Sequence, residues 1–408
     1  MKLSHELTWR GFVNQSTMSD LTALDRGKLT FYHGYDAASD SLTIGNLAAL
    51  MMDKCFLRHG HKAIFLTGGA TSLIGDPGGK DSERSLQAAD VIKSNIEKIT
   101  VQIKRLFGSD ALIINNLDWF QEIKLLDFLR DIGKHFSMTP LVQRDYIAKR
   151  MGEHGSGISY AEFSYTILQG YDFLKLFEDH NVTLQLAGSD QWGNGISGVE
   201  LVRRVKSAEV HVLSCPLIVN KSTGQKFGKT EAGAIWLDPN KTSVFKFYQY
   251  WLNVDDESAL DYLKIFTELD KTAIEKLITS FKQNPAGRLA QKTLAHEVTK
   301  LVHGSDQTAK VEQVTEVLFG EQDFFKLSEP EIKILRSELT NIKLQKDSAQ
   351  TLIKAQLATS ISDAQRLITE GAISVNGMKL EINQDPEWRS GSNLVKRGKN
   401  NFAIVQRD

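Results

Sequence analysis

Short apolar runs alternate with longer helical patterns between residues 24 and 240. The runs are rich in β-branched and aromatic residues and lie at 29–32, 63–66, 111–114, 184–186 and 210–213. Strands that alternate with helices indicate a parallel sheet covered by helices, and such a sheet binds ligands beyond the carboxyl ends of its strands. We therefore predict an α/β fold, with a Rossmann-like doubly wound parallel sheet domain over residues 1–240. Its chemistry should follow Tyr32, Leu66, Ile114 and Leu186.

The pattern changes after residue 240. Apolar residues from Ser243 to Gly304 follow helical spacing, which predicts a helical domain over residues 241–320. Residues 321–347 are charged, less periodic and interrupted by Pro330, so we expect a linker there.

The last segment, 348–408, has the pattern of a small α+β domain. A helix should end at Gly371, and the following strand at 372–375 should run into a hairpin turn at Asn376 and Gly377.

Composition excludes several classes of protein. The 408 residues carry 49 Lys+Arg against 50 Asp+Glu, a formal charge of -1, so any contact with nucleic acid must come from local patches. The two cysteines, Cys55 and Cys215, exclude a disulfide framework and suit a reducing compartment. No stretch approaches the roughly 18 apolar residues of a membrane span. We expect a cytoplasmic protein without a membrane anchor.

A polar, glycine-bearing turn follows the first strand and opens a helix near Ile44. Such a helix start presents free backbone N–H groups to an anion. Gly34 and Gly45 allow a nucleotide to approach the backbone, whereas Asp36 and Asn46 offer polar contacts to ribose or phosphate. The alternative is an ordinary strand-to-helix turn with a capping residue.

A glycine-rich segment from Thr67 to Lys80 follows the second strand. From Gly75 to Lys80 it is one residue too short for a phosphate-binding P-loop, and Asp81 stands where that loop needs Ser or Thr. A Walker-type NTPase is therefore disfavoured, and a glycine-rich surface turn is the alternative. The sequence also has no GxSxG and no HExxH motif, so hydrolase and metalloprotease functions lack support.

Three polar residues share one face of a predicted helix. Tyr165, Gln169 and Asp172 are spaced i, i+4 and i+7 among apolar neighbours, which indicates a pocket wall, although a solvated face is the alternative. Small and polar residues at 188–194 follow the next strand, at the same edge of the predicted sheet. The loop 224–230 carries two lysines suited to phosphate charge, or else is a solvated turn.

In this order, the clusters resemble the class I aminoacyl-tRNA synthetases, and in detail the bacterial-type tyrosyl-tRNA synthetases, over essentially the whole chain. Residues 43–46 (Thr-Ile-Gly-Asn) stand where that class has its HIGH signature, and residues 226–230 (Lys-Phe-Gly-Lys-Thr) correspond to its KMSKS loop. Residues 188–194 (Gly-Ser-Asp-Gln-Trp-Gly-Asn) are a hallmark of the tyrosyl enzymes. Residues 362–380 resemble an S-four-like RNA-binding domain, first described in a small-subunit ribosomal protein. The resemblance thus implies that residues 348–408 are this RNA-binding domain and that the helical domain at 241–320 binds the anticodon.

This resemblance implies a tyrosine–tRNA ligase that takes ATP with Mg²⁺ as a substrate and tRNA(Tyr) as a partner. Tyr32 and Asp172 would bind the phenol of tyrosine. The α-amino group would be held by Tyr165, Gln169, Asp76 and Gln191, with Asn116 orienting its neighbours. A phenylalanine would leave Asp172 and Tyr32 unpaired in a dry site. No editing domain is needed.

The resemblance also assigns the nucleotide and the chemistry. The ATP-binding residues would be His33, Gly34, Asp36, Gly45, Gly188, Asp190, Leu217, Ile218 and Lys229. The catalytic residues would be Lys80, Arg84, Lys226, Lys229, Thr43 and Asn46. Lys396, Arg397 and Lys399 would contact RNA phosphates, or else form a solvated cluster. A homodimer is expected, whereas DNA and protein metal ligands are not.

Two departures from the family pattern concern the departing pyrophosphate. Ala38 stands where a Thr is usual, and Thr43 where a His is usual; losing one such donor typically costs about 2.7–4 kcal/mol. The alternative is therefore an adenylation-weak paralogue that acts as an RNA-binding protein. The Thr-Ile-Gly-Asn motif also suggests a tryptophanyl enzyme, which the Tyr32–Asp172 pair disfavours. His33, where Cys is common, either contacts ribose or fills space.

Overall fold

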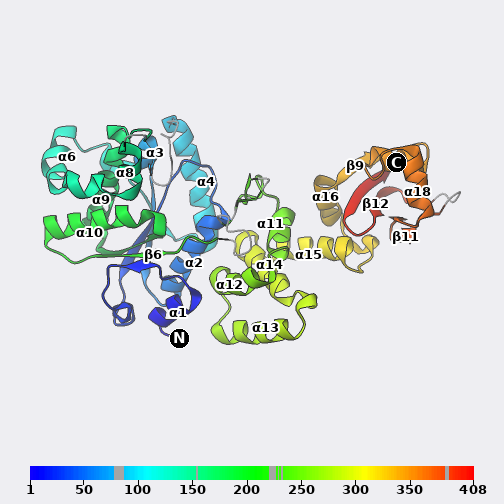
Figure 1. Ribbon diagram of the computed structural model, residues 1–408, viewed down its shortest axis with the longest axis horizontal. Helices are drawn as coiled ribbons and strands as arrows, with labels where there is room; N and C mark the ends of the chain where they lie inside the picture. The colour runs from blue at the N-terminus through cyan, green and yellow to red at the C-terminus, as the bar shows by residue number, and fades with distance from the viewer. Residues whose placement is uncertain (78–86, 153–154, 220–226, 228, 231–232, 382–385) are drawn as a thin grey trace. The chain divides into compact units, whose positions relative to one another are not determined.

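The computed structural model describes residues 1–77, 87–152, 155–219, 227, 229–230, 233–381 and 386–408, with the backbone alone for 145, 146, 229 and 230. The chain divides into two compact units (Figure 1). Residues 1–242 and 253–294 form the first unit, and residues 243–252 and 295–408 form the second.

A six-stranded sheet forms the centre of the first unit. Its strands lie in the order β1-β6-β5-β2-β3-β4, and all neighbours are parallel except β1 and β6. The strands are β1 (Gln15–Ser16), β2 (Thr30–Tyr35), β3 (Lys62–Thr67), β4 (Leu112–Asn115), β5 (Val182–Gly188) and β6 (His211–Cys215). Each of the five predicted runs overlaps one of the parallel strands, so the predicted α/β fold is confirmed. β2 lies between β3 and β5, which places a switch in strand order at its carboxyl end.

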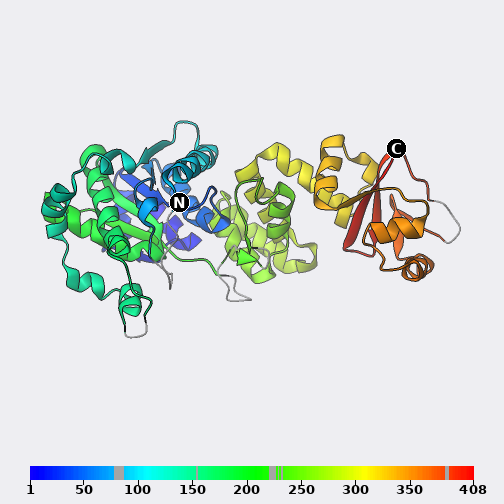
Figure 2. The same cartoon turned by 90° about the horizontal axis from the view of Figure 1, so that it is seen from above.

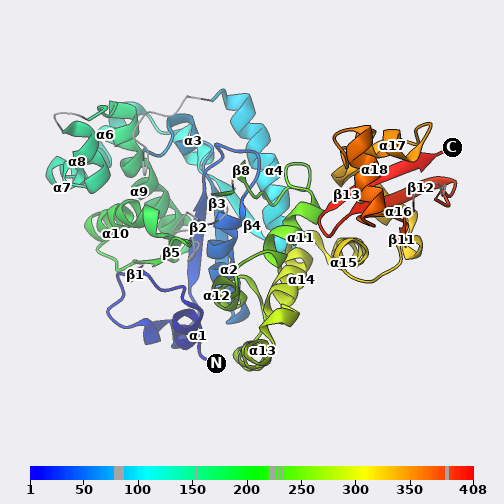
Figure 3. The same ribbon diagram turned by 45° about the vertical axis from the view of Figure 1, so that its right-hand side comes forward.

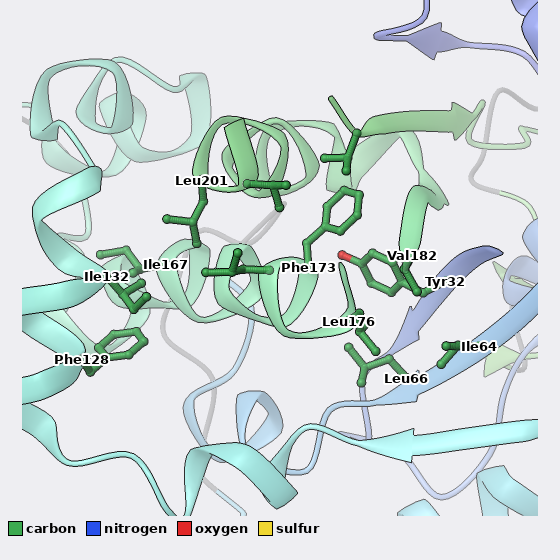
Figure 4. Packing of buried hydrophobic residues seen from close by; sticks show 13 residues of the cluster. Tyr32, Ile64, Leu66, Phe128, Ile132, Ile167, Phe173, Leu176, Val182 and Leu201 are labelled. Carbon is green, nitrogen blue, oxygen red and sulfur yellow. The ribbon is translucent and has the colours of Figure 1, made fainter. Parts of the chain in front are cut away.

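Helices cover both faces of this sheet, as Figure 3 shows. α2 (Ile44–Arg58) packs on β3 and β5 on one face, and α9 (Tyr160–His180) and α10 (Trp192–Lys206) pack on β5 and β6 on the other. The core on the second face contains Tyr32, Phe173 and Leu201 (Figure 4). The other helices of this part are α1 (Leu3–Arg10), α3 (Thr71–Ile74), α4 (Ala89–Phe107), α5 (Leu117–Phe120), α6 (Leu125–Asp131), α7 (Met138–Val142) and α8 (Asp145–Met151).

The predicted domain boundary near residue 240 differs from the structure, because two later helices belong to the first unit. They are α12 (Asp256–Phe266) and α13 (Lys271–Gln283). The buried guanidinium of Arg10 donates hydrogen bonds to the carbonyl oxygens of Lys264, Thr267 and Leu269, which ties the end of α12 to α1. The short strands β7 (Lys229–Thr230) and β8 (Gly233–Ala234) pair with each other.

The second unit contains helices and a five-stranded sheet of order β11-β10-β12-β13-β9. The helices are α11 (Val244–Leu252), α14 (Leu289–His303, whose first turns belong to the first unit), α15 (Ser305–Phe319), α16 (Glu329–Glu338), α17 (Ser348–Lys354) and α18 (Ile361–Thr369). The strands are β9 (Thr340–Lys343), β10 (Ile373–Val375), β11 (Met378–Lys379), β12 (Gly391–Arg397) and β13 (Asn401–Arg407). Helices α11 to α14 confirm the helical pattern expected between 243 and 304.

Both faces of this sheet are covered, as the red strands and orange helices of Figure 2 show. Leu394 and Ile404 pack with Leu335 of α16, while their neighbours Val395 and Val405 pack with α17 and α18. Adjacent residues of a strand point to opposite faces, so β12 and β13 each contribute to two cores.

The prediction of a linker at 321–347 is wrong. The segment folds as a 3-10 helix (Phe324–Lys326), α16 and β9, and β9 pairs in parallel with β13. By contrast, the expected hairpin turn is present, because Asn376 and Gly377 both have positive φ, 53° and 87°.

Candidate active site

A pocket of about 470 Å³ opens at the carboxyl ends of the parallel strands in the first unit. It brings together most of the residues that the sequence suggested. Its walls include Tyr32, His33, Gly34, Asp36, Thr43, Gly45, Asn46, Asp76, Asn116, Tyr165, Gln169, Asp172, Gly188, Asp190, Gln191, Leu217 and Ile218. Tyr165, Gln169 and Asp172 therefore form a pocket wall and not a solvated face.

Asp172 is a buried carboxylate held by two donors. Asn116 Nδ2 lies 3.1 Å from its Oδ2, and Trp119 Nε1 lies 3.0 Å from its Oδ1. Burial raises the pKa of Asp172 to about 8, although both hydrogen bonds act to lower it. Asn116 is fully buried, and its Oδ1 accepts from the backbone N–H of Ala70 at 2.8 Å, so its amide is fixed in one orientation.

Three residues that line the same pocket as Asp172 carry buried polar atoms without a hydrogen-bond partner. The hydroxyl of Tyr32 and the Oε1 atoms of Gln169 and Gln185 are buried, and they make no hydrogen bond with any described residue. Leaving such an atom unsatisfied costs about 1–3 kcal/mol, so the pocket is built to receive a polar ligand here. Tyr32 and Gln185 are cross-strand partners on β2 and β5, which aligns their side chains in the same wall.

The sequence reasoning missed Trp119 and Gln185. Gln185 had a weak signal, because it is a polar residue inside an otherwise apolar strand. Trp119 had none, because its partner Asp172 is 53 residues away.

A second acidic group lies on the same pocket wall. Gln191 Nε2 donates to Asp76 Oδ2 at 2.6 Å, and Asn194 Nδ2 donates to Gln191 Oε1 at 3.2 Å. The Asn194 contact fixes which end of the Gln191 amide faces Asp76. Asp76 is largely buried, which makes its carboxylate suited to an ammonium group.

The polar turn after β2 is held by hydrogen bonds of its own. Asp36 Oδ1 accepts from Ser72 Oγ at 2.8 Å and from the backbone N–H of Ala38 at 3.0 Å. Asn46 Oδ1 accepts from both the backbone N–H and the hydroxyl of Thr43, each at 2.9 Å. The capping arrangement offered as an alternative is thus present, at residues that also line the pocket.

Some of the predicted residues cannot be placed. Lys80, Arg84 and Lys226 lie outside the described residues, and of Lys229 only the backbone, in β7, is described. Phe227, in the same loop, is buried, lines the pocket and stacks on Phe266 with ring centroids 5.0 Å apart.

The predicted RNA contacts differ in their surroundings. Lys396 Nζ donates to the carbonyl oxygens of Val317 and Leu318 at the end of α15, and burial lowers its pKa. Arg397 Nη1 donates to the carbonyl oxygen of Leu357 at 3.0 Å. Lys399 is exposed. The first two side chains therefore have structural partners that charge patterning did not reveal.

The described residues contain no cluster of three or more His, Cys, Asp or Glu side chains that could hold a metal ion. None of the described helices is long and apolar enough to cross a membrane.

Comparison with known proteins identifies the class. The family described as tRNA synthetases class I (W and Y) matches residues 24–320. Among solved structures, a C-terminally truncated mitochondrial tyrosyl-tRNA synthetase of Aspergillus nidulans has a TM-score of 0.70 and 29% identity, covering 78% of this chain and 94% of that one. The chain has the fold of a class I aminoacyl-tRNA synthetase and belongs to that class.

Relatives that match over their full length show which group of this class the chain belongs to. Tyrosine–tRNA ligase of Levilactobacillus brevis is 39% identical and covers 100% of this chain and 99% of its own length. Tyrosine–tRNA ligase 2 of Bacillus cereus is 40% identical, with 100% and 99% covered. The chain belongs to the bacterial-type tyrosyl-tRNA synthetases.

Proposed function

We propose that the chain activates tyrosine with ATP, releases pyrophosphate, and transfers the tyrosyl group to the 3′ end of tRNA(Tyr). The observation that carries this proposal is the buried end of the pocket. There the Asp172 carboxylate and the unpartnered hydroxyl of Tyr32 line the same wall. A phenol satisfies both, because it has one hydrogen to donate and an oxygen that accepts.

The remaining polar groups fit the amino-acid end of tyrosine. Its ammonium group can donate to Asp76 and to the free Oε1 of Gln169, and Tyr165 completes this wall. A phenylalanine in the same pocket would leave the buried hydroxyl of Tyr32 unpaired and would offer no donor to Asp172, which would keep only Asn116 and Trp119. Rejection of phenylalanine then follows from unsatisfied polar groups and needs no editing site.

The first chemical step needs no nucleophile from the protein. A carboxylate oxygen of tyrosine bonds to the α-phosphorus of ATP while the bond to the bridging oxygen of the β-phosphate breaks, and pyrophosphate leaves with Mg²⁺. The chain contributes positioning and positive charge. We assign the charge to Lys80, Arg84, Lys226 and Lys229, and polar contacts to Thr43 and Asn46. His33, Gly34, Asp36, Gly45, Gly188, Asp190, Leu217 and Ile218 would seat the nucleotide.

Amino-acid-dependent ATP–pyrophosphate exchange tests this function without tRNA. Tyrosine, tryptophan and phenylalanine are compared at one enzyme concentration. We expect exchange with tyrosine alone, which would also show that Ala38 and Thr43 support catalysis. Exchange with tryptophan alone would indicate a tryptophanyl enzyme. No exchange with any of the three, together with tight tRNA binding, would indicate the RNA-binding paralogue.

The pKa of Asp172 predicts a pH dependence of tyrosine binding. With a pKa of about 8 in the free protein, Asp172 is mostly protonated at neutral pH. A phenol that donates to the carboxylate favours the ionised form, so binding releases a proton. Tyrosine affinity should therefore rise about tenfold per pH unit below this pKa and level off above it.

Isothermal titration of tyrosine from about pH 6 to pH 8.5 measures this effect. In the Asp172→Asn variant, the remaining affinity for tyrosine should not change with pH over the same range. A flat profile in the wild-type chain would contradict ionisation of Asp172 in the complex.

We assign tRNA binding to the second unit. Lys399 is the best candidate for a phosphate contact among the three predicted basic residues, because it is exposed and Lys396 and Arg397 bond to main-chain carbonyls. We place the reaction in the cytoplasm, which suits the two free, buried cysteines.

Exposed apolar side chains on α6, α7 and α8 support the proposed homodimer. We call this set the apolar patch, and it consists of Leu125 (70% exposed), Leu126 (78%), Leu129 (42%), Met138 (58%) and Met151 (56%). Helices α7 and α8 contact each other, as Figure 3 shows. A buried ion pair fixes α8 to α9, because Arg150 Nη1 and Nη2 donate to Glu162 Oε1 and Oε2, each at 2.8 Å. Exposed apolar side chains on a fixed frame are typical of a protein interface.

Leu126→Lys should therefore convert a dimer to a monomer in sedimentation velocity at micromolar concentration. Val101→Lys is the matched control, because Val101 is also exposed (61%) but lies on α4. A dimer that survives Leu126→Lys would exclude this patch as the interface, and a monomeric wild-type chain would exclude the dimer.

A further inference from the structure

A buried carboxylate outside the proposed chemistry lies next to the nucleotide end of the pocket. Asp53, on α2, is 0% exposed, and burial raises its pKa while His33 and Tyr35 oppose that rise. Placing a carboxylate where water cannot reach it is costly unless hydrogen bonds compensate. The contacts of Asp53 show what the carboxylate does there.

Two residues of β2 supply those contacts. His33 Nδ1 lies 3.0 Å and 2.9 Å from the two oxygens of Asp53, and the hydroxyl of Tyr35 donates to Oδ2 at 3.1 Å. Residues i and i+2 of a strand point to the same face, which places both side chains against α2. The two rings stack with centroids 4.7 Å apart and an interplanar angle of 19°. The imidazole of His33 is thus held by a bond and by packing.

The bond to Asp53 also selects the tautomer of His33. A carboxylate accepts the hydrogen of Nδ1, so in the neutral ring the hydrogen resides there and Nε2 carries a lone pair. The side chain of His33 is 7% exposed and lines the pocket, and Nε2 is the polar atom it can offer to a ligand. The other titratable groups near this arrangement are Tyr35, Cys215 and Asp190, and burial raises the pKa of Cys215 to about 12, which keeps that thiol neutral.

We propose that Asp53 is a positioning residue that holds His33 so that Nε2 accepts a hydrogen bond from the nucleoside of bound ATP. The donor must be a hydroxyl or amino hydrogen of the nucleoside, because the phosphate oxygens of ATP are acceptors. This inference rests on the proposed function and adds to it a residue that touches no substrate and acts through His33.

Steady-state pyrophosphate exchange tests the effect on substrate binding. Asp53→Asn keeps the shape of the side chain but no longer imposes one tautomer on His33. We expect KM for ATP to rise about three- to ten-fold, as for the loss of one hydrogen bond, with kcat and KM for tyrosine within about two-fold. Tyr35→Phe is the matched control, because it removes a bond to Asp53 and leaves the His33 bond in place; its KM for ATP should stay within about two-fold.

A double-mutant cycle separates positioning from general damage. If Asp53 acts only through His33, the variant with both Asp53→Asn and His33→Gln should have the same KM for ATP as His33→Gln alone. Nitrogen-15 NMR of labelled histidine gives an independent readout. One resonance pair should report the Nδ1–H form, shift when ATP is added, and lose that form in Asp53→Asn.

The outcomes distinguish this inference from the proposed function. A wild-type chain without tyrosine-dependent exchange contradicts the proposed function. Normal exchange combined with an unchanged KM for ATP in Asp53→Asn, equal losses for tyrosine and ATP, or additive effects in the cycle would overturn the role of Asp53.

Discussion

Replacing Asp172 by asparagine should lower kcat/KM for tyrosine about 100-fold and leave KM for ATP within about two-fold. The carboxylate is buried, and a hydrogen bond to a charged partner contributes about 1.5–3 kcal/mol, the upper end of which corresponds to a factor of about 100. An asparagine can accept from the phenol, but it lacks the charge, and it meets Asn116 and Trp119 with an amide that also carries donors. Pyrophosphate exchange at varied tyrosine and ATP concentrations measures both constants.

Asp179→Asn is the matched control for this variant. Asp179 lies on the same helix, is exposed, and pairs with Lys175 on the surface. Its substitution should change neither constant. Tyrosine kinetics that survive Asp172→Asn would remove this end of the pocket from tyrosine recognition.

Removing the chain after Gly320 should spare pyrophosphate exchange and lower tRNA charging by at least about 100-fold. The pocket lies wholly in the first unit, whereas the sheet proposed to hold tRNA lies beyond the cut. Losing several phosphate contacts weakens nucleic-acid binding by orders of magnitude.

The position of the cut matters. Ending the chain near residue 344 would leave α16 and β9 without the strands on which they pack, because β9 lies at the edge of the described sheet beside β13, and Leu335 packs with Leu394 and Ile404. Aminoacylation and exchange should be compared in the same preparation, with Lys399→Glu in the full chain as a milder test of the same surface. Full charging by the shortened chain would exclude a role for the second unit in tRNA binding.

Much of the fold could be predicted from the sequence, because apolar runs and helical spacing depend on residues that are close together in the chain. Each of the five parallel strands of the first sheet overlaps a short apolar run, and Tyr165, Gln169 and Asp172 share a face through helical spacing alone. The residues that follow separate strands lie together at the carboxyl edge of the sheet, as expected when the strands are parallel. The structure shows these side chains around one pocket, and their roles toward tyrosine and ATP stay predictions.

The failures involve contacts between distant residues. β9 looked like part of a linker because its partner strand begins 58 residues after β9 ends. The charge of Lys396 is visible in the sequence, but the carbonyl groups at the end of α15 that it satisfies are not. The contact of Asp53 could not be predicted either, because the sequence does not show that α2 lies against β2, where the carboxylate of Asp53 bonds to His33.

The place of β13 within its sheet has a consequence for biosynthesis. β13 lies between β12 and β9, so β9 has no partner until residues 401–407 have been made. A ribosome synthesises the chain from its amino end, and domains generally fold in that order. The strands of the first sheet end at residue 215 and can assemble first, while β9 remains an unpaired strand that can pair with wrong partners. Chaperone binding to nascent chains should therefore persist until β13 emerges.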